Sequence, residues 1–412
     1  MRKISERSFV NILYPIIITI FIFYRGCRLF SLVGNINISF LVVSCLLFGV
    51  WVFGSGTHVY IDKSMTLLLI FILYVVIDGI IRTQYAAEAF EYWSLLIAII
   101  AFCLTLYNEE TVVQNITTHS YKASIIMVSM IFLQAFFPSI VRFLQRIWFT
   151  PTGFETASYA YSRGYCTGLT SFSAAAVWYC FILMSFEIGK LFNTETNKLR
   201  HILMLIISAV AMLYTQKRSI LIASVAAIYI SILLFSKRRD SKFIRSIILS
   251  FFLVLIAWWA YHTIPQVQYM VFKTNRVGNA LSGRDYYWNI LLPMYKSSPL
   301  FGVGGGTAMH LFGFGGHNCY IQLLAEYGIV GLLLFLFGFG LPLVKSIIKA
   351  KIFLGQYRYT QKGEIFITSI IIQVVFFIYC FSGNPLFDQI FFMSEIICIT
   401  ISQIVLKESI RA

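Results

Sequence analysis

Long apolar stretches alternate with short polar segments along the whole chain. Most stretches approach the ~20 residues that a helix needs to cross the hydrocarbon core of a bilayer, and a helix satisfies its backbone hydrogen bonds internally. We therefore predict an all-α, polytopic membrane protein with about twelve transmembrane helices, forming a single integral membrane domain over residues 1–412. The predicted spans are residues 9–24, 32–53, 65–80, 93–107, 120–140, 169–189, 201–215, 219–236, 243–262, 318–344, 364–382 and 386–406.

The composition agrees with this pattern. Hydrophobic residues make up 59% of the chain and charged residues 12%, which is about half the charged share of a soluble domain. The formal net charge is +15, but the basic residues mostly lie in short segments between the apolar stretches, where they set membrane orientation. We therefore expect no nucleic-acid partner.

The strongest basic segments fix the predicted orientation. By the positive-inside rule, "KRRDSK" (residues 237–242) and the Lys/Arg-rich residues 345–362 should be cytoplasmic. Both termini are then cytoplasmic as well, and two long loops, residues 142–168 and 263–317, lie on the outer side. Loops of this length in a compact protein are commonly functional, and we expect the first of them to contribute to substrate specificity.

The second outer loop carries cations on the side where they are disfavoured, including Arg276 and Arg284. Arg284 could form an ordinary ion pair with its neighbour Asp285, or its planar guanidinium could bind a phosphate through two hydrogen bonds. The following "YYWNILLPMY" is amphipathic and could lie at the membrane interface, at the depth of lipid phosphates.

Lys217 and Arg218 form a second outer pair, in "YTQKRSILIASVAAIYI", between two predicted helices joined by almost no loop. Their side chains could extend to the interface. A charged residue at the end of a membrane helix is also a candidate functional residue.

His317 follows two glycines and precedes Asn318, which is a good N-cap for the next helix. The histidine could be no more than a polar residue at a helix entry, or it could accept a proton near neutral pH. Asn318, Gln322 and Glu326 share one face of that helix, and a carboxylate in a membrane span is costly without a partner. We expect Glu326 to face the protein interior.

Three weaker features lie on the same outer side. The glycine-rich "FGVGGG" (residues 301–306), with Gly304 and Gly305, would let backbone N–H groups approach a ligand, but it lacks the lysine and hydroxyl residue of a P-loop. Arg163 and Asp388 could line a cavity or be ordinary loop charges. The cysteines show no spacing that suggests a metal site.

The order of these features resembles the O-antigen ligase and polymerase superfamily, which includes Wzy polymerases and WaaL ligases. The block runs over residues 282–331, with "GR", "P..G.G.G" and "HN.Y..LLAEYGI.G" in that order, and "TQKRS" (residues 215–219) precedes it.

This resemblance implies a GT-C-type glycosyltransferase that uses neither a metal nor a nucleotide sugar. Arg218 and Arg284 would hold the diphosphate of an undecaprenyl-diphosphate-linked glycan, and His317 would act on the acceptor hydroxyl. Together with these three catalytic residues, we predict a set of substrate-binding residues: Lys217, Arg276, Arg163, Asn318, Gly304, Gly305 and Glu326.

The resemblance further implies a Wzy-type O-antigen polymerase of the bacterial inner membrane with a periplasmic active site. Its partners would be the lipid-linked glycan donor and acceptor, membrane lipids and a chain-length regulator. A ligase that passes finished polymer to a lipid A core is the alternative within the superfamily. A flippase for the same lipid-linked unit is the alternative from another class, although transporters commonly show related halves.

Overall fold

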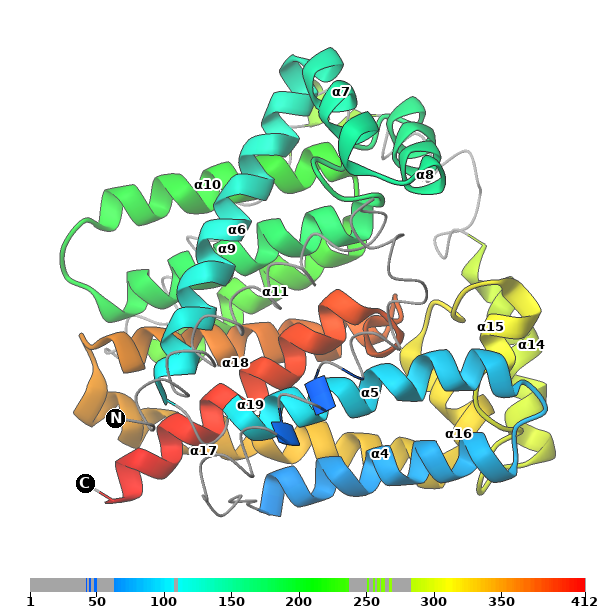
Figure 1. Ribbon diagram of the computed structural model, residues 1–412. Helices are drawn as coiled ribbons and strands as arrows, with labels where there is room; N and C mark the ends of the chain where they lie inside the picture. The colour runs from blue at the N-terminus through cyan, green and yellow to red at the C-terminus, as the bar shows by residue number, and fades with distance from the viewer. Residues whose placement is uncertain are drawn as a thin grey trace.

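The computed structural model describes residues 63–106, 110–236 and 283–411, with scattered positions between 42 and 49 and between 250 and 268. The all-α prediction is confirmed for these residues, which form helices joined by turns and loops (Figure 1). The elements are α4 (Lys63–Ile81), α5 (Ala86–Leu106), α6 (Glu110–Phe136), α7 (Pro138–Trp148), α8 (Pro151–Ser162), α9 (Ser173–Asn193), α10 (Lys198–Thr215), α11 (Arg218–Phe235), α14 (Arg284–Ser297), α15 (Thr307–Phe312), α16 (Cys319–Phe335), the π-helical turn η1 (Leu336–Gly340), α17 (Leu341–Tyr357), α18 (Gln361–Cys380), the 3-10 turn η2 (Pro385–Phe387) and α19 (Gln389–Arg411).

The described part of the chain is a multi-pass membrane protein, because it contains 7 helices long and apolar enough to cross a bilayer. Nine of the twelve predicted spans coincide with helices of the structure. The first two and residues 243–262 lie wholly or largely outside the described residues, so the count of twelve stays a prediction.

Helix α9 lies inside the bundle, where it contacts α6, α10, α11, α18 and α19. Trp178 of α9 is fully buried against Phe391 of α19, with ring centroids 4.6 Å apart. Its indole N–H donates to the Ser394 hydroxyl at 3.0 Å, which satisfies the one polar atom of this ring. Aromatic packing of this kind ties α9 and α19 together directly below the candidate site.

Helices α16 and α17, joined by η1, form a segment of 39 residues, Cys319–Tyr357, in which the helix is broken once, at Gly328. At ~1.5 Å per residue it is about 58 Å long, well beyond the ~30 Å hydrocarbon core. The residues after the predicted end of this span at residue 344, including Lys345, Lys349 and Lys351, are helical as well and belong to α17.

The two outer loops also contain helices. Residues 142–168 are mostly α7 and α8, and α7 buries Val141 while Phe143 and Ile147 are exposed. The described part of the second loop contains α14 and α15, which lie at the end of α4, α5 and α16 (Figure 1). Most of residues 264–282 lie outside the described residues.

The predicted alternation of the loops agrees with the structure wherever it is described. The α4–α5 and α10–α11 turns, α8, α14, α15 and the α18–α19 turn lie at one end of the bundle. The α9–α10 turn, the α17–α18 turn and the end of α19 lie at the other (Figure 1). The first of these ends holds the candidate site.

Candidate functional site

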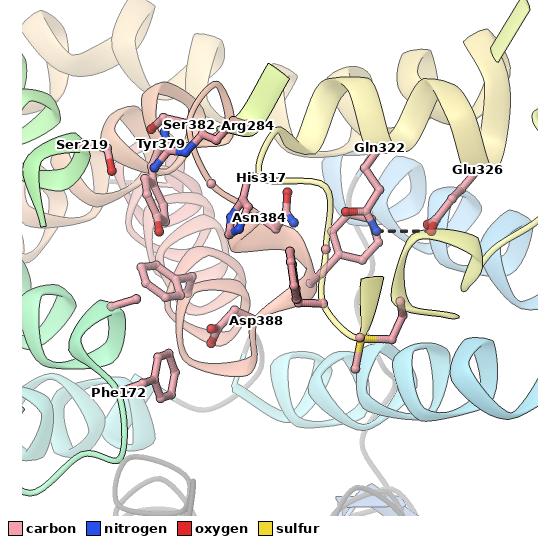
Figure 2. A pocket seen from close by; sticks show the side chains of 18 of the residues that line it. Phe172, Ser219, Arg284, His317, Gln322, Glu326, Tyr379, Ser382, Asn384 and Asp388 are labelled. Carbon is pink, nitrogen blue, oxygen red and sulfur yellow. Dashed lines mark hydrogen bonds between the residues drawn. The ribbon is translucent and has the colours of Figure 1, made fainter. Parts of the chain in front are cut away.

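A cavity of about 420 Å³ opens where the ends of eight helices and the α15–α16 loop meet. Its lining comes from the beginnings of α5, α9, α11, α14, α15, α16 and α19 and from the end of α18. The polar and charged side chains among them are Glu88, Lys217, Ser219, Arg284, His317, Gln322, Glu326, Tyr379, Ser382, Asn384 and Asp388. Figure 2 shows His317 beside Asn384 in the middle of this group, with Arg284, Tyr379 and Ser382 together on one side.

Helix α16 fixes the position of His317, the residue two before its start. Asn318 caps α16 as predicted, because its side-chain oxygen accepts from the backbone N–H of Ile321 at 3.1 Å. The other end of the Asn318 amide donates to the carbonyl of Phe381 at 3.2 Å. Both ends of this buried side chain therefore serve the α16–α18 junction, and the predicted role of Asn318 in substrate binding is not supported.

His317 is half-buried and adopts a left-handed backbone conformation with φ +56°. Burial, Arg284 and Lys217 together lower its pKa from the ordinary 6.5 to about 4. The imidazole is therefore neutral at pH 7 and able to accept a proton. Its ring stands against the edges of Tyr287 and Phe314, with centroids 5.6 Å and 5.2 Å away.

Arg284 is the first residue of α14 and lines the same cavity. It forms no ion pair with Asp285, although the structure describes both residues, so the simpler of the two interpretations of this arginine is wrong. Burial, and with it the nearby charge of Arg218, lowers the pKa of Arg284. A bound anion would relieve this unfavourable burial of positive charge.

Lys217 also lines the cavity, whereas Arg218, the first residue of α11, does not. The electrostatic effects of Lys217 on His317 and of Arg218 on Arg284 place all four residues in one neighbourhood. The N-terminus of α11 adds the positive end of a helix dipole to this group. The three cations thus come from two segments far apart in sequence, and they form a positive wall suited to phosphate oxygens.

The comparison with known families is consistent with this geometry. Residues 203–336, about a third of the chain, match the family model described as O-antigen ligase. This segment of the chain is therefore similar to the O-antigen ligase family. The matched segment includes Lys217, Arg218, Arg284 and His317. No curated protein matches the chain significantly.

This match supports a glycosyltransferase-like membrane enzyme of the O-antigen ligase or polymerase type. Several cavity residues lie outside the matched segment, on α5, α9, α18 and α19. Sequence reasoning flagged Asp388 among them and missed Glu88, Tyr379, Ser382 and Asn384, as well as Ser219 inside the segment. The sequence signal that could have identified Ser382 and Asn384 is the turn "SGNP" before Asp388, because it marks a tight turn between two predicted spans on the predicted outer side.

Gly304 and Gly305 of the glycine-rich loop do not line the cavity. The N–H of Gly304 donates to the Glu326 carbonyl at 2.9 Å, and the N–H of Gly305 donates to a carboxylate oxygen of Asp78 at 3.0 Å. The prediction that these N–H groups bind a ligand is wrong, since both have protein acceptors.

Glu326 faces the interior, as predicted, with 1% of its surface exposed. One carboxylate oxygen accepts from the backbone N–H of Ala308 at 2.8 Å and from the Gln322 amide at 3.3 Å. Glu326 thus has a polar partner four residues earlier on its own helix, Gln322.

Arg163 does not line the cavity. It ends α8, with its guanidinium 4.7 Å from the ring centre of Tyr159. None of residues 142–168, all of which the structure describes, lines the cavity, so their expected direct contribution to specificity is not supported. Arg276 lies outside the described residues.

Proposed function

We propose that the protein is an inverting glycosyltransferase that polymerises lipid-linked oligosaccharide repeat units into O-antigen or a related surface polysaccharide. It would transfer the growing chain from undecaprenyl diphosphate onto a new lipid-linked repeat unit, at the periplasmic face of the bacterial inner membrane. The observation that carries the proposal is the cavity in which His317 lies beside Arg284 and Lys217.

The positive wall suits the leaving group of this reaction. Breaking the bond between the sugar and the diphosphate leaves growing negative charge on the phosphate oxygens. Fixed guanidinium and ammonium groups in a site that excludes much water stabilise such charge strongly. Arg284 and Lys217 line the cavity, where they would stabilise this charge. Arg218 does not line the cavity, but its charge acts on Arg284.

His317 suits the acceptor. A sugar hydroxyl is a weak nucleophile, and a neutral imidazole can accept its proton as the oxygen attacks the anomeric carbon. The bond to the diphosphate breaks as the new glycosidic bond forms, so a single displacement inverts the anomeric centre. The negative diphosphate would also raise the pKa of His317 while it is bound, which makes the imidazole a better base when substrate is present.

Two alternatives lead to different observations. A ligase would pass finished polymer to a lipid A core, and its loss would remove all attached glycan from lipopolysaccharide. Loss of a polymerase would remove the ladder of long chains while single repeat units remain attached. A flippase would move the lipid-linked unit across vesicles without transferring any glycan. We favour the enzyme because a general base and a phosphate-binding wall share one cavity.

The direct test is glycan transfer by the purified protein with a defined undecaprenyl-diphosphate-linked repeat unit, in the presence of EDTA because we propose transfer without a metal ion. We expect His317→Ala to lower kcat by about 10² to 10⁴, the usual contribution of a general base. Arg284→Ala should lower it by about 10² or more, as loss of one charge-stabilising group does.

Matched controls lie at the other end of the bundle. His119→Ala on α6 and Arg200→Ala on α10 remove the same residue types without touching the cavity, so both should retain transfer. Full activity of His317→Ala would refute its role as base, and absence of transfer by the wild-type protein would refute the proposed enzyme.

A further inference from the structure

Helix α16 is interrupted at Gly328, whose φ of 65° and ψ of −166° are not helical. The backbone N–H groups of Ile329 and Val330, which would normally bond within the helix, instead donate to the carbonyls of Pro299 and Leu300 at 2.9 and 3.1 Å. The loop in turn donates two hydrogen bonds to α16. The N–H of Val303 donates to the Ala325 carbonyl and the N–H of Gly304 to the Glu326 carbonyl, both at 2.9 Å. The break is therefore completed by the glycine-rich loop.

This crossing needs glycine on both sides. A Cβ on Gly302 would lie 2.3 Å from the carbonyl carbon of Glu326, and a Cβ on Gly328 would lie 2.3 Å from the Leu300 oxygen. The two backbones approach so closely that neither position accommodates a side chain.

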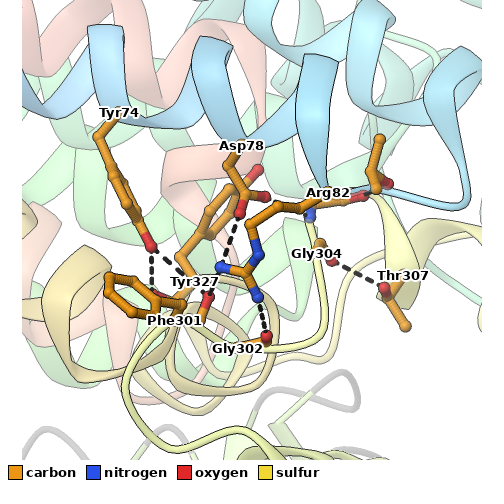
Figure 3. Close-up of polar contacts among 10 residues, drawn as sticks. Tyr74, Asp78, Arg82, Phe301, Gly302, Gly304, Thr307 and Tyr327 are labelled. Atoms are coloured by element: carbon orange, nitrogen blue, oxygen red, sulfur yellow. Dashed lines mark hydrogen bonds and ion pairs between the residues drawn. The ribbon is translucent and has the colours of Figure 1, made fainter.

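Helix α4 holds the other side of the loop (Figure 3). Arg82 donates to the carbonyl of Phe301 at 2.9 Å and to that of Gly302, and it forms an ion pair with the buried Asp78 at 3.2 Å. Asp78 in turn accepts from the N–H of Gly305 at 3.0 Å. A pair of charges four residues apart, Asp78 within α4 and Arg82 just after its last residue, thus binds the loop at Phe301, Gly302 and Gly305.

The hydrogen bonds continue from this crossing to the catalytic histidine. Glu326 accepts from Gln322, as described above, and the Gln322 side-chain oxygen accepts from the N–H of Gly316 at 2.9 Å. The carbonyl of Gly316 accepts from the indole of Trp288 at 3.1 Å. Gly316 directly precedes His317, so both polar atoms of its backbone are fixed by side chains.

We propose that Gln322 and Glu326 are positioning residues that fix the backbone at His317 for glycan transfer, and that Asp78 and Arg82 support them indirectly, through the glycine-rich loop that bonds to α16. The inference rests on the proposed function of His317 as base. A non-glycine residue with positive φ persists only where its surroundings hold it there, and a base displaced by about 1 Å can lose 10²-fold in rate. The hydrogen-bond network that runs from α4 through the glycine-rich loop and α16 holds the backbone at His317 in this conformation.

Glu326 acts here as a hydrogen-bond acceptor, which distinguishes it from an acid or a base. Its second carboxylate oxygen is buried and has no hydrogen-bond partner among the described residues. Glu326→Gln keeps an oxygen for Ala308 and Gln322 and places its NH₂ where that unpartnered oxygen stood. We therefore expect Glu326→Gln to retain kcat within about threefold, whereas Glu326→Leu should lower kcat by about 10 to 100-fold with little change in KM for the donor.

Gln322 is tested by two variants of different severity. Gln322→Leu removes both hydrogen bonds, and Gln322→Asn keeps polarity but is one methylene too short to bridge Gly316 and Glu326. Both should lower kcat by about 10 to 100-fold with KM nearly unchanged. The matched control is Gln373→Leu, because Gln373 is an equally buried glutamine of a membrane helix that lies outside the network.

A second measurement does not depend on transfer. Diethyl pyrocarbonate modifies neutral imidazole, and mass spectrometry of peptides gives the rate at each histidine. We expect Gln322→Asn to raise the rate of modification at His317 severalfold and to leave the rate at His201, at the other end of the bundle, unchanged.

An unchanged rate at His317 together with wild-type kcat in Gln322→Asn would overturn the proposed network. A Glu326→Gln variant as inactive as Glu326→Leu would overturn the role of Glu326 as a hydrogen-bond acceptor. If the wild-type protein transfers no glycan, the proposed function fails, while the modification rates still test the network.

Discussion

The charge state of His317 is decided by its neighbours. Burial disfavours the imidazolium most, and the positive charges of Arg284 and Lys217 add to the effect, which together bring the pKa to about 4. Because the neutral imidazole is the active form, the activity limited by this group is present above pH 4 and is lost as the pH falls through the pKa. If Arg284 and Lys217 bind the donor as proposed, the same cations also help to keep the base unprotonated in the free enzyme.

Replacing Lys217 by Met tests this coupling. Removal of one positive charge makes the imidazolium less unfavourable, so the pKa of His317 should rise from about 4 towards 6.5. The acidic limb of kcat/KM, which reports the free enzyme, should move to higher pH by the same amount. Lys190→Met, which removes a lysine from the far end of α9, should leave the limb in place, and an unshifted limb in Lys217→Met would contradict the electrostatic explanation.

At the scale of elements, the decisive feature is the break in α16. A membrane helix can be interrupted only where its backbone groups find other partners, and the loop of residues 299–304 provides them. The break also turns the glycine-rich loop into a structural element. Its glycines serve the crossing with α16, and this is why the motif lies between the arginine and the histidine in sequence.

Gly328→Ala should therefore destabilise the protein by at least ~1 to 3 kcal/mol, the usual cost of such a backbone conformation in a residue with a side chain. The clash of the new Cβ with Leu300 adds to this cost. The thermal unfolding midpoint of the purified protein in detergent measures the effect. Gly355→Ala is the control, because a Cβ there has open space within α17 and alanine favours helix; equal midpoints for the two variants would argue against the crossing.

At the scale of the whole molecule, the two ends of the bundle differ in the function of their cations. Lys190, Lys198 and Arg200 lie at the end without the cavity, where they follow the positive-inside rule. Lys217 and Arg284 lie at the cavity end, against that rule, and line the site. The proposed diphosphate ligand would account for positive charge on the side where the positive-inside rule disfavours it.

The proposed orientation predicts which positions a membrane-impermeant maleimide can reach. With the cavity end outside, Glu155→Cys on the exposed face of α8 should be labelled in intact spheroplasts, and Thr196→Cys in the α9–α10 turn only after lysis. The wild-type protein gives the background labelling of the native cysteines, of which Cys166, Cys180, Cys319, Cys380 and Cys398 are buried. The opposite labelling pattern would invert the topology and exclude a periplasmic site.

Much of the site could be predicted because several of its signals are local. His317, Arg284 and Lys217 stand next to turn residues or helix ends, and each is a charged or titratable group at the edge of an apolar span. The cap at Asn318 follows from two adjacent residues and needs no tertiary information. The partner of Gly305 could not be predicted, because Asp78 lies more than 200 positions away in sequence.

The sequence by itself determined the helical class, the boundaries of most spans and the alternation of the loops, because hydrophobic length and the placement of lysine and arginine are properties of single segments. Only the tertiary structure decided which polar groups meet. It brought α18 and α19 into the cavity, assigned the glycine-rich loop to the break in α16, and left Arg163 outside the site. The physical reason is that a hydrogen bond or a cavity wall depends on how helices pack, and periodicity along one segment contains no information about its neighbour in space.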